Sequence, residues 1–160
     1  MDEILNNKLV SALEECRAHA KRLEYVIPLI ADLFPLSSTS MKSLSDERIG
    51  QIDQFIYRFS KLQDSMGLRL FPAIFAYTEA RAEPIPFIDM LFKLEQNGII
   101  LSAEDWQYFR NLRNLFAHEY PERPDEIVQS LNELFSSWDR FLEMYNFVRM
   151  KTEARLHQAR

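Results

Sequence analysis

The chain has 160 residues, of which 47% are hydrophobic and 27% are charged, and this suits one domain with a substantial core. With only 3 glycines and 1 cysteine, the composition argues against a glycine-rich phosphate loop, an internal disulfide and a cysteine-cluster metal site. The formal net charge of −5 argues against wide, nonspecific wrapping of nucleic acid, but it leaves room for a local basic cleft.

The N-terminal segment, MDEILNNKLV, is acidic and lacks the apolar stretch of a secretory signal. No run approaches the roughly 18 apolar residues that a membrane span needs. We therefore expect a soluble, cytoplasmic protein with no membrane partner. Cys16 lies in an apolar-periodic run, so we expect a buried, inert thiol.

The first segment predicts one long helix, because its apolar residues recur at steps of three and four from Leu5 to Phe34. Pro28 lies inside this stripe and should kink or interrupt the helix. The serine-rich stretch PLSSTSMKSLS (35–45) predicts a loop.

Asp46 and Glu47 suit the first turn of a second helix, where carboxylates meet the positive end of the helix dipole. Its apolar stripe continues past Gly67, which could interrupt it, as far as Tyr77. The two prolines of RAEPIP (81–86) should break the helical pattern. A short helix follows and should end at Asn97-Gly98, with the glycine as a left-handed cap.

Ser102 and Asp105 form a capping signature at the start of the next helix, which Pro121 and Pro124 should end. From about Asp125 the apolar period predicts one long helix to near the C-terminus. No segment has a sustained strand period. The sequence therefore predicts a single all-α domain over residues 1–160, an up-and-down bundle of about five helices.

The stretch RNLRNLFAHEYP (110–121) carries the densest group of polar side chains that could handle a phosphate or a proton. With about 100° per residue, a buried face contrasts with a polar arc that contains Arg110, Asn111, Arg113, Asn114 and His118. Arg113 and His118 lie roughly 140° apart, so they should not touch within one regular helix. Ala117 between them is small enough to let another surface approach closely.

Metal-independent cleavage of RNA needs a base for the 2′-hydroxyl, an acid for the leaving oxygen and a cation for the phosphate. His118 could supply the first two only in sequence, whereas a two-fold dimer would bring two histidines and two arginines into one cleft. The alternative is an ordinary solvated helix face on which His118 only interacts favourably with the helix dipole.

The pattern Arg113, four residues, His118, one residue, Tyr120 resembles the Arg-x4-His-x-Tyr signature of HepT-like toxins in the HEPN superfamily. Three flanking segments resemble that family in order and spacing: YRFSKLQDSMGLRLFPAI (57–74), PFIDMLFKLEQNGII (86–100) and SAEDWQYFRNLRNLFAHEYPE (102–122). The resemblance covers roughly residues 46–135.

The resemblance implies a homodimeric helical bundle that acts as a metal-independent endoribonuclease on tRNA or mRNA, without a cofactor. It also implies a toxin–antitoxin module whose partner, an MntA-like minimal nucleotidyltransferase, attaches AMP to the motif tyrosine. By position, Arg113 and His118 are then catalytic, Asn114 assists and Tyr120 is the modification target. Arg110 and Arg123 could extend a basic patch for RNA, with solvated surface arginines as the equal alternative.

Two other functions stay open at this point. The chain could be a non-catalytic substrate or accessory subunit of a nucleotidyltransferase, or a plain helical adaptor. Tyr57, Phe59 and Phe71 are expected in the core rather than as platforms for stacking bases. His19 and His157 receive little weight as functional residues.

Overall fold

The computed structural model of the chain describes residues 3–79, 83–117 and 124–158, and helices are the only regular secondary structure in these ranges. The elements in chain order are α1 (Glu3–Ile30), the 3₁₀ turn η1 (Ala31–Leu33), α2 (Ser38–Lys42), α3 (Asp46–Ser65), the π turn η2 (Met66–Leu70), α4 (Phe71–Thr78), α5 (Phe87–Gln96), α6 (Ala103–Phe116), α7 (Pro124–Ser136) and α8 (Trp138–Gln158). The prediction of an all-α helical bundle is confirmed. Across the described ranges, no helix has the length and apolarity that a bilayer crossing requires.

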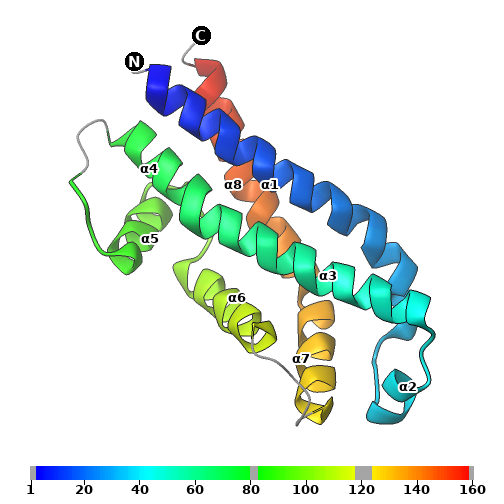
Figure 1. Cartoon of the computed structure of the whole chain (residues 1–160). Helices are drawn as coiled ribbons and strands as arrows, with labels where there is room; N and C mark the ends of the chain where they lie inside the picture. The colour runs from blue at the N-terminus through cyan, green and yellow to red at the C-terminus, as the bar shows by residue number, and fades with distance from the viewer. Residues whose placement is uncertain (1–2, 80–82, 118–123, 159–160) are drawn as a thin grey trace.

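Two long helical segments, called rods below, form the framework of the fold (Figure 1). The first rod is α1, and the second is the continuous run of α3, η2 and α4, which packs along α1 in the opposite direction. Helix α6 contacts α3 and α5, while α7 contacts α2, α6 and α8. Helix α8 returns along α1, so that the two chain ends lie at the same end of the molecule.

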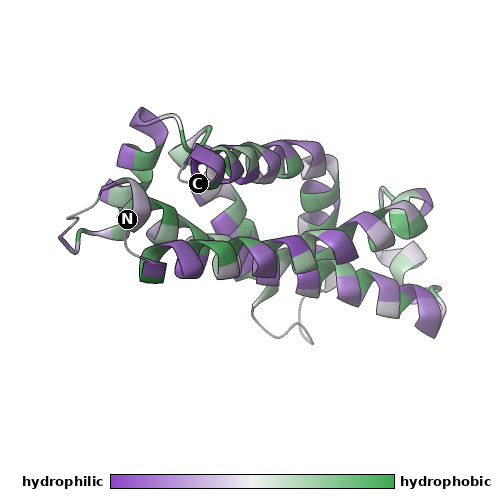
Figure 2. Cartoon of the chain, turned by 90° about the horizontal axis from the view of Figure 1, so that it is seen from above, coloured by the Kyte–Doolittle hydropathy of each residue, from purple (hydrophilic) through white to green (hydrophobic). Residues whose placement is uncertain are grey.

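Aromatic side chains fill the space where α3, α6 and α8 meet. The ring centroids of Phe59 and Phe141 lie 5.1 Å apart, and those of Phe109 and Phe141 lie 5.0 Å apart, both in edge-to-face arrangements that favour aromatic pairs. All three rings are fully buried. The helices accordingly carry hydrophobic and hydrophilic residues on different sides (Figure 2). This cluster fixes the position of α6, which carries the polar motif.

Several helix ends follow the sequence prediction. The Ser102 hydroxyl accepts a hydrogen bond from the backbone N–H of Asp105 at 3.0 Å and caps α6. Helix α5 ends at Gln96, with Asn97 as its C-cap, and Gly98 follows with a φ of 64°, a conformation that glycine adopts without strain. The start of α6 and the end of α5 therefore lie where the sequence predicts.

Three predictions of helix boundaries need correction. The serine-rich stretch is not all loop, because Ser37 and Ser40 form a reciprocal capping box that starts the short helix α2. Pro28 does not break α1, which continues for two more residues and then tightens into η1. The predicted last helix is two helices, separated at Ser137, whose hydroxyl donates to the backbone oxygen of Glu133 at 2.7 Å. Such bonds from serine to the preceding turn compete with regular helix geometry.

Gly67 lies in the π turn η2, where the second rod passes α6. A Cβ atom at this position would lie 2.8 Å from Cζ2 of Trp106, closer than two carbon atoms can pack. The rod is therefore not interrupted at Gly67, as the sequence could suggest, but widened by one π turn. The missing side chain lets the Trp106 indole lie directly against the rod.

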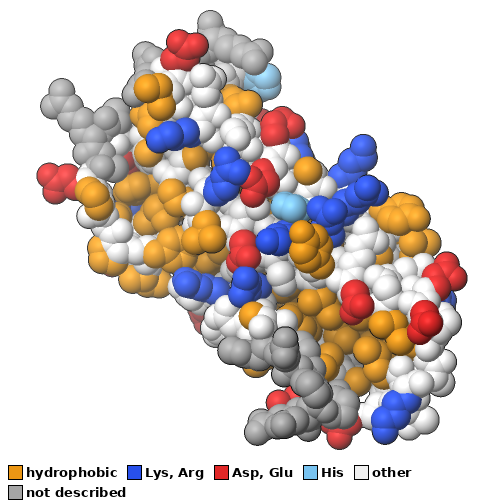
Figure 3. Space-filling view, in the orientation of Figure 1, with side chains coloured by type: hydrophobic (Ala, Val, Ile, Leu, Met, Phe, Trp, Pro, Cys, Tyr) orange, Lys and Arg blue, Asp and Glu red, His pale blue; other side chains and the backbone are white. Residues whose placement is uncertain are grey.

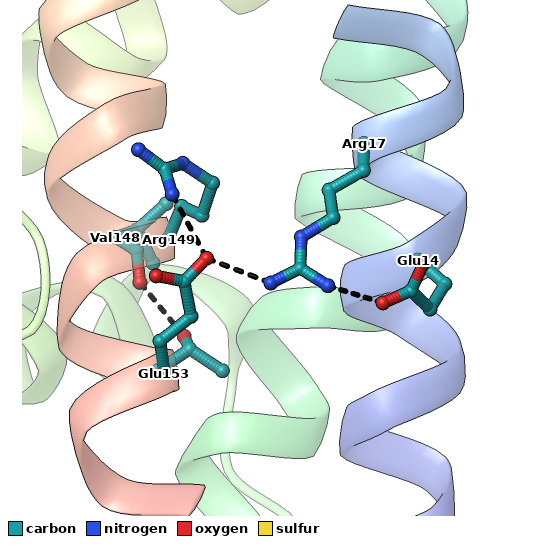
Figure 4. Close-up of polar contacts among 6 residues, drawn as sticks. Glu14, Arg17, Val148, Arg149 and Glu153 are labelled. Carbon is teal, nitrogen blue, oxygen red and sulfur yellow. Dashed lines mark hydrogen bonds and ion pairs between the residues drawn. The ribbon is translucent and has the colours of Figure 1, made fainter. Parts of the chain in front are cut away.

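An ion-pair cluster joins the two helices that carry the chain ends (Figure 4). Arg17 on α1 donates to Glu153 on α8 at 2.8 Å, and Arg149 donates to the same Glu153 oxygen at 2.9 Å. Arg17 also pairs with Glu14. Although partial burial alone would raise it, the pKa of Glu153 is lowered overall by the hydrogen bonds from the two arginines.

Candidate functional site

Helix α6 presents the polar motif as the helical geometry predicts. Phe109, Leu112 and Phe116 are buried against the rest of the bundle, whereas Arg110 and Asn114 are exposed. The helix ends at Phe116, and the backbone N–H of Ala117 closes its last turn on the Asn114 carbonyl at 3.2 Å. The described part of the motif therefore forms the last turns of α6, and its polar side chains face outward.

Three residues of the predicted site lie outside the described residues: His118, Tyr120 and Arg123. The described chain stops at Ala117 and resumes at residue 124. The relation between Arg113 and His118, and the position of the proposed modification target, stay predictions.

Arg113 is held by a carboxylate from another helix. Its Nη2 donates to Oδ2 of Asp64 on α3 at 2.8 Å, and the two side chains keep 28% and 30% of their exposure. The Nε of Arg113 is buried and has no hydrogen-bond partner. A guanidinium that is fixed through one nitrogen is oriented, and the part of the Arg113 side chain that remains exposed can still meet an oxygen ligand.

Sequence reasoning missed Asp64. Nothing in the local sequence singles it out, because its importance comes from the packing of α3 against α6. One signal was present, since Asp64 lies within the segment 57–74, on which part of the predicted family resemblance rests. The motif and that segment meet at this ion pair.

Arg113 lies between two hollows in the surface. One, of about 430 Å³, is bordered by Tyr57 and Ile56 of α3, by Leu131 of α7 and by Ala117 at the end of α6. The other, of about 350 Å³, lies on the opposite side of Arg113 and extends toward α5 and η2. Apolar side chains gather over α2, α3 and α7, in the lower right of the view (Figure 3). The motif arginine thus borders both an apolar hollow and a more polar one.

A basic cluster with an exposed aromatic ring adjoins the apolar hollow. Tyr57 is 53% exposed, and Cζ of Arg58 and Nζ of Lys61 lie 5.3 Å and 5.6 Å from the centre of its ring. Arg58 also lies 3.1 Å from Nδ1 of His19, whose pKa is lowered first by burial and then by the charges of Arg58 and Lys61. Exposed aromatics flanked by cations are typical of single-stranded nucleic-acid surfaces.

The prediction that Tyr57 belongs to the core is therefore wrong. Phe59 and Phe71, predicted with it, are fully buried. Tyr57 follows directly after a half-buried residue of the α3 stripe, and a helix rotates by about 100° per residue. This rotation places its ring on the outward side, and the helical period alone could have revealed it.

The remaining candidate residues lie in two kinds of environment, one at the surface and one in the core. The Arg110 guanidinium carbon lies 5.4 Å from the centre of the Phe87 ring and borders the more polar hollow. Cys16 is buried as predicted, and burial raises the pKa of its thiol to about 12, which makes it a poor nucleophile. Within the described ranges, no group of three or more histidine, cysteine or acidic side chains is placed to hold a metal ion.

Comparisons with models of protein families, with curated proteins and with solved structures found no match for this chain. The resemblance to HepT-like toxins is therefore a prediction that rests on the quoted segments alone. In chemical terms, the described site offers an oriented arginine, further cations and an exposed aromatic ring around two hollows. This set can bind a phosphate diester together with unpaired bases.

Proposed function

We propose that this chain is the cytoplasmic toxin of a HEPN/MNT-type toxin–antitoxin module and cuts RNA as a metal-independent, homodimeric endonuclease. The observation that carries the proposal is the set of contacts and the partial burial of the Arg113 side chain. Its guanidinium is held by Asp64 at 2.8 Å, keeps an unpartnered buried Nε and borders two hollows. A purely solvated surface arginine would need neither the carboxylate nor the partial burial.

The proposed reaction uses the RNA itself as the nucleophile. A His118 imidazole takes the proton of the 2′-hydroxyl, the 2′-oxygen attacks the adjacent phosphorus, and the bond from phosphorus to the 5′-oxygen breaks. The second His118 of the dimer protonates the leaving oxygen. Arg113 stabilises the added negative charge on the phosphate, and Asn114 assists by hydrogen bonding. The products are a 2′,3′-cyclic phosphate and a 5′-hydroxyl.

The dimer is part of this proposal because each chain has one motif histidine. The apolar hollow that ends at Ala117 gives a surface next to the motif on which a second copy could pack. A two-fold axis near this hollow would bring both copies of Arg113 toward one cleft. Sedimentation at micromolar concentration should therefore detect a dimer, and a monomer would argue strongly against the mechanism.

Regulation by a nucleotidyltransferase partner completes the proposal. Addition of AMP to Tyr120, two residues after His118, would place a phosphate's negative charge and a bulky group where the RNA phosphate must dock. Co-expression with an MntA-like partner should raise the intact mass by one or more AMP groups. Tyr120→Phe should prevent this addition and keep the toxicity.

Growth after induced expression tests the proposal in cells. Wild-type chain without a partner should stop growth, whereas Arg113→Ala and His118→Ala should be harmless at equal protein levels. Arg22→Ala, which changes an exposed arginine on α1, is the matched control and should stay toxic. If all of these proteins are equally harmless, the toxin assignment fails.

A second candidate function has one observation in its favour. The Asp64 carboxylate neutralises part of the Arg113 charge, and the chain carries a net charge of −5, so the field at the site is weaker than the motif alone suggests. These features suit a non-catalytic subunit that a nucleotidyltransferase modifies. Such a subunit would gain AMP on co-expression, yet the purified, unmodified dimer would leave RNA intact.

A further inference from the structure

Arg58 and Lys61 on α3 lack the carboxylate partners that most other described arginines have. Over residues 3–79, 83–117 and 124–158, six arginines form ion pairs with acidic side chains, whereas Arg58 and Lys61 form none. Both cations lie beside the exposed ring of Tyr57, within 6 Å of its centre. In a chain with a net charge of −5, two unpaired cations at one place create a local positive potential.

A histidine on α1 holds Arg58 without cancelling its charge. Nη1 of Arg58 lies 3.1 Å from Nδ1 of His19, and because a guanidinium has only donors, this Nδ1 accepts and carries no proton. Burial, followed by the charges of Arg58 and Lys61, lowers the pKa of His19 and favours the neutral imidazole. His19 therefore fixes Arg58 and leaves its charge intact, whereas Asp64 neutralises part of the charge of Arg113.

The cations and the nearby acids of α3 lie on opposite sides of Tyr57. With about 100° per residue, Arg58 and Lys61 lie on the side toward α1, and Asp53 and Asp64 lie on the side of the hollows beside the motif arginine. Lys and Arg side chains gather around a histidine in the middle of the face that Figure 3 shows. An anion that approaches from the α1 side of the ring therefore meets the cations before the acids.

The exposed ring favours a nucleic-acid strand over a simple anion. Tyr57 is 53% exposed and lines the same hollow of about 430 Å³ as Arg113. Cations alone attract any anion, but an exposed aromatic ring beside them adds a stacking surface for a base. Two cationic positions joined by an aromatic ring match the alternation of phosphates and bases along a single strand.

We propose that Arg58 and Lys61 bind a phosphate of the RNA strand that runs to Arg113. Tyr57 stacks on a base between this phosphate and the one at Arg113. His19 is a positioning residue of this phosphate subsite, because it acts through Arg58. The proposal rests on the proposed function, since it takes single-stranded RNA as the ligand. It adds a length requirement, because a substrate must extend beyond the cut phosphate to reach the subsite.

The salt dependence of binding measures phosphate contacts, because each neutralised phosphate releases counterions. The Kd of a 2′-O-methyl octanucleotide, which cannot be cut through the 2′-oxygen, is measured with the full chain by fluorescence anisotropy at several salt concentrations. Arg58→Gln and Lys61→Gln should each reduce the slope of log Kd against log salt by about 0.7, which is about fivefold in Kd at 0.1 M salt. Tyr57→Ser should raise the Kd and keep the slope. Lys8→Gln, at an exposed lysine on α1, is the control and should change neither.

Two His19 variants test how Arg58 is held. His19→Leu removes the acceptor and should raise the Kd, whereas His19→Gln, whose amide oxygen can accept the same hydrogen bond, should restore most of the affinity. Equal Kd values for His19→Leu and the wild type would remove the positioning role.

A labelled peptide of eight glutamates tests the alternative ligand, an acidic protein segment. At the same salt concentration it should bind the wild type more weakly than the octanucleotide does, and Tyr57→Ser should not change its Kd. Peptide binding as tight as RNA binding would overturn the proposal.

A double variant, Arg58→Gln with Lys61→Gln, that keeps the wild-type Kd and slope would also overturn the proposal. Lys61 is exposed, so Lys61→Gln decides the question even if Arg58→Gln does not fold. Cleavage of unmodified RNA is measured separately. Cleavage by the wild type, together with a wild-type Kd and slope in the double variant, overturns only the subsite. The expected slope changes without cleavage by the wild type overturn only the proposed endonuclease.

Discussion

The Asp64 carboxylate on α3 holds the Arg113 guanidinium on α6 at 2.8 Å. This ion pair links the middle of the longer rod to the last turns of the helix that carries the proposed RNA-cleavage motif. Both side chains remain about 30% exposed, so solvent screens the pair and its contribution to stability is small. Its main effect is to fix the orientation of the Arg113 guanidinium.

Asp64→Ala should therefore reduce cleavage more than it reduces stability. We expect the rate to fall about tenfold, because a misplaced arginine loses part of its contact with the transition state. The melting temperature should change by only a few degrees, since exposed pairs contribute about 1 kcal/mol or less. Single-turnover cleavage and thermal unfolding by circular dichroism measure the two effects.

Glu143→Ala is the control for this substitution, since Glu143 is an exposed acid on α8. It should leave the cleavage rate unchanged. A wild-type rate for Asp64→Ala would show that Arg113 needs no orienting partner.

Gly67→Ala should destabilise the fold, whereas Gly50→Ala should stabilise it. A Cβ at position 67 would lie 2.8 Å from Trp106, while a Cβ at position 50 would meet nothing within 4 Å. We expect a loss of about 1–3 kcal/mol from overpacking at Gly67 and a gain of about 0.5–1 kcal/mol from helix propensity at Gly50. Denaturant unfolding measures both, and equal effects of the two substitutions would contradict the close packing of Trp106 on η2.

The Glu153 cluster should make stability depend on pH. Because the hydrogen bonds from Arg17 and Arg149 outweigh burial and lower the pKa of Glu153, this carboxylate stabilises the fold above its unfolded-state pKa, about 4.3. That stabilisation is lost as the pH falls through the lower, folded-state pKa. Glu153→Gln should cost about 1 kcal/mol at pH 7 and nearly nothing in strong acid.

Melting temperatures of the wild type and Glu153→Gln between neutral and acidic pH test whether Glu153 stabilises the fold more at neutral pH than in acid. The two curves should converge as the pH falls. Glu143→Gln, which changes an exposed acid on the same helix, should follow the wild type throughout. Curves for Glu153→Gln and the wild type that stay parallel at all pH values would exclude the cluster as a source of pH dependence.

Tyr57→Ser should weaken binding of single-stranded RNA. The ring is exposed beside Arg58 and Lys61, and stacking of one base on such a ring contributes about 1–3 kcal/mol. We expect at least a fivefold rise in Kd, measured by fluorescence anisotropy with a non-cleavable RNA. Tyr25→Ser removes another exposed tyrosine, on α1, and should not change the Kd. Equal affinities of the two variants would show that Tyr57 is not part of the RNA-binding surface.

The sequence predicted two helix ends that depend on local chemistry, although it missed the local capping box of α2. Ser102 caps its helix and Gly98 ends one in the left-handed conformation, because each residue acts on its own backbone neighbours. The division of the last helix at Ser137 was missed, because the apolar period continues from Leu134 to Trp138 across the break. Periodicity detects a stripe of buried residues and does not detect a change of direction between two helices that share it.

The candidate site was predicted less completely, for a related reason. Arg113 and Arg110 could be singled out because they lie in one short motif on one helix. Asp64 could not, since its contact with Arg113 arises where α3 packs against α6. A single sequence carries little information on which polar residues of two helices will face each other.

Cleavage of a single-stranded RNA by the purified, unmodified protein in the presence of EDTA tests the proposed endonuclease most directly. The proposed mechanism predicts fragments that end in a 2′,3′-cyclic phosphate and a 5′-hydroxyl, with activity lost in His118→Ala and reduced by a factor of about 10²–10³ in Arg113→Ala. Intact RNA after incubation with the wild type, or equal cleavage by the wild type and His118→Ala, would contradict it.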